Sequence, residues 1–115
     1  MNTPSRMRAL SVRQPYAEQI LRGSKRIEYR SVPTKIRERV YIYASLTPGD
    51  AQDFRAMKAQ PGDFPTGVLV GIVEIVNCTG ESGDYCWHLA RPERLKQLLK
   101  PENHPQPVWF YPFDA

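Results

Sequence analysis

The segment Gly67–Val76, with the sequence GVLVGIVEIV, is the longest apolar run in the chain. Its many β-branched residues predict a long strand over Val68–Cys78. The run is interrupted by Glu74 and is shorter than the roughly 18 apolar residues that a membrane-spanning helix needs. We therefore expect this strand to lie in the core of the fold, and we expect no membrane partner.

Shorter elements flank this strand, and their order predicts the fold class. The other predicted strands are Arg8–Val12, Lys25–Arg30, Arg39–Ser45, Tyr85–Leu89 and Val108–Phe113; the predicted helices are Pro15–Arg22, Gly49–Ala59 and a segment from Pro92 through Leu99. In Arg39–Ser45, alternation places Val40, Ile42 and Ala44 on one face and Tyr41 and Tyr43 on the other. Strands do not alternate regularly with long helices, which disfavours a doubly wound parallel sheet. The order predicts an α+β fold, a small mixed β-barrel with about three short helices.

Length and cysteine content restrict the class of protein further. A chain of 115 residues predicts one domain, 1–115, with its core at about 8–112. Met1–Arg8 has no apolar segment typical of a secretory signal, so we expect a cytoplasmic protein. We also expect a monomer. In that compartment Cys78 and Cys86 are expected to be free thiols rather than a disulfide.

Positive charge is concentrated in the first part of the chain. Residues 1–40 hold ten Lys and Arg against three acidic residues, whereas residues 41–115 hold six against nine. Such asymmetry indicates a basic face and a polyanionic partner. The alternative is an arginine-rich surface that faces only solvent.

The densest polar cluster follows the first predicted helix, in Gly23–Arg30 (GSKRIEYR). Gly23 suits a sharp turn at the end of the helix. Glu28 and Arg30 are two residues apart in a strand, so they share a face and can pair. Lys25 can reach the same site only if it belongs to the turn, because in a regular strand it would face the other way. A surface ion pair beside a solvated lysine is the alternative to a ligand site.

Other candidates lie in neighbouring segments. Glu74 can be a general base or the partner of an arginine; burial would raise its pKa unless a cation pairs with it. Ser11, Arg13 and Gln14 lie between a strand and a helix and can bind a phosphate or a base, or act as caps. Tyr43 and Ser45 share a strand face where a base can stack. Cys78, Cys86, His88 and His104 match no zinc spacing, so no metal or cofactor is expected. Trp87 is expected in the core.

Two motifs carry a resemblance to a known family. Leu10–Ala17 (LSVRQPYA), followed by Ile20-Leu21-x-Gly23-x-Lys25-x-x-Glu28-x-Arg30, resembles the ASCH (activating signal cointegrator homology) family over about residues 8–112. The resemblance implies a PUA-like β-barrel and RNA binding. Some relatives are amidohydrolases of N4-acetylcytidine in which a lysine acts with a threonine three residues later. Here Lys25 matches that lysine, but Glu28 replaces the threonine, and the late Gly-rich turn is absent.

Two functions follow as hypotheses. The first is binding of RNA or of a nucleoside or nucleotide, with Lys25, Arg30, Arg13 and Arg26 supplying charge and Glu28 and Gln14 contacting base edges. The second is a small hydrolase, an amidohydrolase or a ribonuclease, with Lys25 as the central group and Glu28 or Glu74 as acid or base. The departure at position 28 favours binding, and the sequence leaves open whether the protein is an enzyme.

Overall fold

A computed structural model describes residues 6–114 and has a single curled sheet with two short helices. The strands are β1 (Ala9–Val12), β2 (Ile27–Arg30), β3 (Arg39–Ala44), β4 (Val68–Glu81), β5 (Asp84–Leu99) and β6 (Trp109–Phe110); the helices are α1 (Tyr16–Leu21) and α2 (Ala51–Arg55). The strand order is β2-β5-β4-β3-β1-β6, and only the β1–β3 pair is parallel. This open half-barrel confirms the predicted α+β fold and is consistent with a PUA-like β-barrel.

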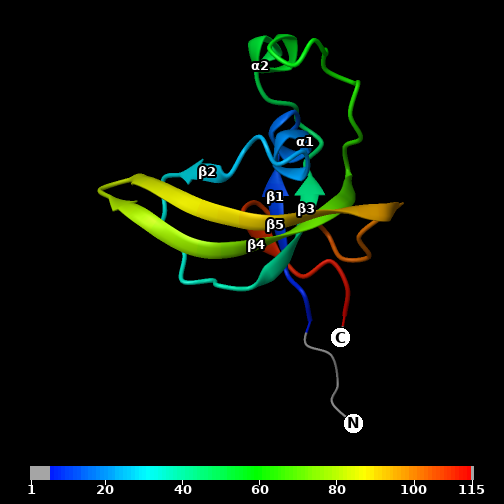
Figure 1. Ribbon diagram of the computed structural model, residues 1–115. Helices are drawn as coiled ribbons and strands as arrows, with labels where there is room; N and C mark the ends of the chain where they lie inside the picture. The colour runs from blue at the N-terminus through cyan, green and yellow to red at the C-terminus, as the bar shows by residue number, and fades with distance from the viewer. Residues whose placement is uncertain (1–5, 115) are drawn as a thin grey trace.

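The long β4–β5 hairpin forms the middle of the sheet and extends beyond the body of the molecule (Figure 1). β1 and β3 run side by side and both point towards α1, and α2 lies beyond α1 (Figure 1). Gly71 in β4 lets α1 approach the sheet, because a Cβ at that position would lie within 3.0 Å of a Leu21 methyl group and of the Glu93 carbonyl. The helix therefore packs on the sheet next to the ends of the two parallel strands.

The core consists of two clusters on opposite faces of β3, as the alternation in Arg39–Ser45 predicts. Val40, Ile42 and Ala44 belong to the larger cluster, together with the fully buried Trp87. Tyr43 lies in the smaller cluster with Phe110 and Leu69 on the other face.

The predicted helix from Pro92 through Leu99 is wrong, because β5 continues through this segment and pairs with β4 as far as Leu69–Leu99. Leu95 and Leu99, four residues apart, share a face in a strand as they do in a helix, and both pack on the smaller cluster. Leu98 distinguishes the two structures, since a helix would place it beside Leu95. Here it is 52% exposed on the other face of the strand.

Within residues 6–114, no helix is long and apolar enough to cross a membrane. Both cysteines are free thiols, as expected. The described residues also contain no group of three or more His, Cys, Asp or Glu side chains that could hold a metal ion.

Candidate functional site

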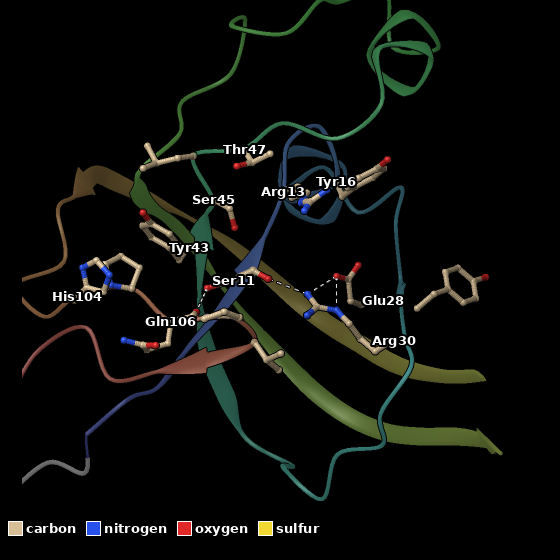
Figure 2. Close-up of a pocket in the computed structure, with 15 residues that line it drawn as sticks. Ser11, Arg13, Tyr16, Glu28, Arg30, Tyr43, Ser45, Thr47, His104 and Gln106 are labelled. Carbon is tan, nitrogen blue, oxygen red and sulfur yellow. Dashed lines mark hydrogen bonds and ion pairs between the residues drawn. The ribbon is translucent and has the colours of Figure 1, made fainter. Parts of the chain in front are cut away.

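A pocket of about 830 Å³ opens where the parallel strands β1 and β3 end (Figure 2). Ser11 and Tyr43, which are register partners on these strands, both line it. The remaining walls come from four other segments. These are the start of α1 with Arg13 and Tyr16, strand β2 with Glu28, Tyr29 and Arg30, the chain after β3 with Ser45–Thr47, and the chain before β6 with His104–Val108. Segments distant in sequence thus meet around one concave surface.

The pocket contains a fixed network centred on Arg30. Its Nε and Nη2 donate to Glu28 Oε2 at 2.9 and 2.6 Å, and Nη2 also donates to the Ser11 carbonyl at 2.9 Å. The guanidinium lies 5.5 Å from the centre of the Trp87 ring. β2 is an edge strand that does not pair with β1, so Arg30 bridges the open side of the half-barrel. The network holds Glu28 and Arg30 rigidly at the pocket wall (Figure 2).

Lys25 precedes β2 and belongs to the turn, the condition under which it can approach Glu28. Its Nζ is 3.6 Å from Glu28 Oε1 and lies 5.7 and 5.2 Å from the ring centres of Tyr16 and Tyr29. Three pocket-lining residues therefore surround the ammonium group. Lys25 itself lines a second, smaller cavity rather than the main pocket, so it forms part of the wall between the two.

Arg13, Tyr43 and Ser45 provide polar groups on another side of the pocket (Figure 2). Arg13 is exposed, and no described residue forms an ion pair or hydrogen bond with its guanidinium. The Tyr43 ring packs edge-on against Phe110 with centroids 5.3 Å apart, and burial raises the pKa of its phenol. Ser45 is positioned because its N–H donates to the Val12 carbonyl at 2.9 Å. Arg13 is thus a cation available to a ligand.

Besides Lys25, three residues that the sequence placed in the site lie outside the main pocket. Gln14 is 1% exposed; its Nε2 donates to the Pro65 carbonyl at 2.9 Å, and its Oε1 accepts from the Glu18 N–H at 3.0 Å. The Gln14 amide is therefore occupied by the fold. Arg26 lines the smaller cavity.

Glu74, the third of these residues, lines neither cavity. It accepts from Arg91 Nε at 2.8 Å, and this hydrogen bond lowers the pKa of its carboxyl group below the usual value. This geometry supports the interpretation of Glu74 as the partner of an arginine, not its interpretation as a general base.

The sequence assigned no site residue within the wall formed by His104–Val108 and gave Tyr16 no place in the site. Ser11 fixes this wall, because its Oγ donates to the Gln106 carbonyl at 2.7 Å and its N–H donates to the Val108 carbonyl at 2.9 Å. The Tyr16 hydroxyl donates to Asp53, and this bond raises the pKa of the phenol. The Pro-rich composition of this wall indicated only an irregular turn, so no local signal pointed to the pocket.

A half-barrel sheet with a helix at the ends of its parallel strands, and a pocket lined by Arg13 and Arg30 at its open side, makes this an α+β protein consistent with a PUA-like β-barrel. The model of the ASCH domain matches residues 10–110, so the chain belongs to the ASCH domain family. The chain is also 34% identical over 83 residues to human activating signal cointegrator 1, and 32% identical over 83 residues to the mouse protein. Each match covers 63% of this chain and 14% of the relative.

The chain thus matches only a small part of these relatives. The chain belongs to the ASCH family, and the fold of this family suggests RNA binding. The predictions of a single domain, a monomer and a cytoplasmic location stay predictions.

Proposed function

We propose that the chain binds RNA, or a modified nucleotide, with one nucleotide held in the main pocket. The observation that carries the proposal is a pocket of about 830 Å³ with a fixed carboxylate and guanidinium on one wall and an unpaired arginine, Arg13, on another. Pockets for small ligands have volumes of roughly 300–1,000 Å³ and use a few fixed polar groups for orientation. The size and the charge pattern both suit a nucleotide.

Glu28 and Arg13 have complementary roles in this proposal. Both hydrogen bonds from Arg30 reach Glu28 Oε2, and Lys25 is 3.6 Å from Oε1, beyond hydrogen-bond distance. Oε1 therefore remains an acceptor for an N–H or amino group on the edge of a base. Arg13 supplies the charge for a phosphate, since its guanidinium has no described partner. The hydroxyl of Ser45 and the Tyr43 ring complete the contacts to the sugar and base.

The hydrolase alternative gains less support from the geometry, because only Glu28 of its three residues lines the main pocket. A general base or a nucleophile must come within hydrogen-bond reach of the reacting atom. Lys25 lines the smaller cavity, not the main pocket, and Glu74 lines neither. A catalytic role for Lys25, Glu28 and Glu74 stays a prediction. The hydrolase function would replace the binding proposal if the wild type turned over N4-acetylcytidine or RNA and Lys25→Ala did not.

Fluorescence anisotropy with 3′-labelled single-stranded RNA pentamers tests the proposal directly. Arg13→Gln should weaken binding about tenfold, because it removes a charge-assisted phosphate contact. It should also make the plot of log K against log salt concentration shallower by about 0.7, the value for one contact to a single strand. Arg55→Gln is the matched control: Arg55 is also exposed and without a described partner, but lies in α2 outside the pocket.

Two results would contradict the proposal. One is an equal loss of affinity in Arg13→Gln and Arg55→Gln, since binding would then depend on charge alone rather than on the pocket. The other is a wild type that binds neither the pentamers nor any of the four nucleoside monophosphates at low salt.

A further inference from the structure

A second cavity, of about 250 Å³, lies between α1, the turn after it and β5. Its floor is apolar and includes Ile20, Val73 and Leu89, whereas its rim carries the cations Lys25, Arg26 and Arg91. No acidic residue lines it. An apolar floor with a cationic rim suits a group that is partly apolar and carries a negative charge, as a nucleotide does.

The charges at this rim are of two kinds. Arg91 is held by Glu74, with Nη2 2.8 Å from Oε2, and Lys25 shares Glu28 with Arg30. Arg26 is exposed, and no described residue forms an ion pair or hydrogen bond with its guanidinium. The cavity therefore has one free cation beside two that are already fixed by carboxylates. Arg26 is the group that an incoming phosphate can reach without breaking an ion pair.

The backbone is built around this cavity by a β-bulge. In the register of β4 with β5, Glu74 pairs with Ala90 and Ile72 with Glu93, so Arg91 and Pro92 together lie opposite the single residue between Ile72 and Glu74. Arg91 has a φ of 54°, a left-handed conformation that few residues with a side chain adopt. Bulges of this kind redirect side chains and are frequent beside functional sites.

The turn after α1, which lies across the cavity from the bulge in β5, leaves the cavity open. Gly23 has a φ of 79°, and no atom lies within 4 Å of the position that a Cβ would take. Two carbonyls of the last turn of α1 are paired, since Ile20 accepts from Gly23 N–H and Gln19 accepts from Ser24 and Lys25 N–H groups. These acceptors are therefore occupied and do not compete with an anion at the rim.

The Lys25 side chain lies between this cavity and residues of the main pocket. Lys25 lines the smaller cavity, and its Nζ lies beside Glu28, Tyr16 and Tyr29 of the pocket. We propose that the smaller cavity is a second subsite, which holds the nucleotide next to the one in the pocket, with its phosphate on Arg26. The inference rests on the proposed function, and it makes the ligand a single strand of at least two nucleotides.

The test compares RNA homopentamers with the four nucleoside monophosphates, using anisotropy and calorimetry. Arg26→Gln should weaken pentamer binding about fivefold and make the salt dependence shallower by about 0.7. Its affinity for a monophosphate should stay within twofold of the wild type. Ala90→Phe, which fills the smaller cavity without altering a charge, should weaken pentamer binding in the same way. Arg55→Gln again serves as the control, and near-ultraviolet circular dichroism verifies each fold.

The outcomes separate the two proposals. If Arg26→Gln and Ala90→Phe bind pentamers as the wild type does, while Arg13→Gln does not, the second subsite is wrong and the pocket remains. If Arg26→Gln weakens monophosphate and pentamer binding equally, the subsite is also wrong. A wild type that binds neither ligand removes both proposals.

Discussion

Replacing Arg30 by alanine should destabilise the fold as well as the pocket. The side chain donates three hydrogen bonds, two to Glu28 Oε2 and one to the Ser11 carbonyl, and it packs over Trp87. Its removal detaches the edge strand β2 from β1 at the open side of the sheet. It also leaves the Glu28 carboxylate, whose side chain is 11% exposed, with only the more distant ammonium of Lys25.

The size of the loss follows from this geometry. Breaking a buried ion pair by removing one partner costs about 3–5 kcal/mol. The arginine side chain is 18% exposed and Lys25 remains nearby, so the lower end, about 3 kcal/mol, is expected. Unfolding entropies of about 2.1 cal/mol/K per residue amount to roughly 0.24 kcal/mol/K for a chain of this length. The midpoint of thermal unfolding should therefore fall by about 12 °C.

Urea unfolding followed by tryptophan fluorescence measures this loss, because Trp87 lies in the core. A double-mutant cycle with Glu28→Ala isolates the pair, and we expect a coupling energy of about 2 kcal/mol. Arg30→Lys should recover less than half of the stability, since an ammonium group cannot reach both Glu28 and the Ser11 carbonyl in the same geometry. A coupling energy below about 0.5 kcal/mol would refute the argument that this pair fastens β2 to β1.

Two further predictions concern stability. Burial raises the pKa of Glu18, but hydrogen bonds from Arg94 and Arg22 outweigh it, and the pKa lies below the ordinary 4.5. The stability that these hydrogen bonds add is complete above pH 4.5 and is lost as the pH falls through the lower pKa of the folded state. Urea unfolding below pH 4.5 should therefore show that Glu18→Gln loses less stability with falling pH than the wild type does. At the β4–β5 turn, Ser82 and Gly83 have φ values of 52° and 86°, as in a type I′ turn. Ser82→Asn should therefore raise the free energy of unfolding by about 0.5 kcal/mol, and a decrease would exclude that turn type.

The fold class could be predicted because alternating side chains along a strand point to opposite faces of the sheet, so the sequence indicates which of them are buried together. The two faces of β3 follow directly from the spacing of its tyrosines and aliphatic residues. The segment after Pro92 could not be assigned, because leucines four residues apart suit a helix and a strand equally. Pairing with β4 decided between them, and the paired residues, from Ile72–Glu93 to Leu69–Leu99, are far apart in the chain. Such a contact leaves no local pattern.

The candidate site divides in the same way. The pairing of Glu28 with Arg30 followed from their spacing of two, and the turn before β2 placed Lys25 beside them. Gln14 directly follows the pocket residue Arg13, and Arg26 directly follows Lys25, but neither Gln14 nor Arg26 lines the main pocket. Gln14 is buried and donates to the Pro65 carbonyl, and Arg26 lines the smaller cavity. Proximity in sequence predicted one cleft where the structure has two cavities.

The basic character of the first 40 residues shows why charge must be considered with its partners. Arg8, Arg22 and Arg39 all form ion pairs with carboxylates, to Glu38, Glu18 and Glu93. The charges of those arginines are already paired within the protein, so they neutralise a polyanion less readily than an unpaired arginine. Arg13 and Arg26, which have no such partner among residues 6–114, each border one of the two cavities.

If Arg13 and Arg26 make the phosphate contacts, the plot of log K against log salt concentration for binding to a single strand has a slope of about −1.4. If the whole excess of seven positive charges acted, the slope would be about −5. The measured slope therefore distinguishes a site built from two particular arginines from a diffuse attraction to a basic surface.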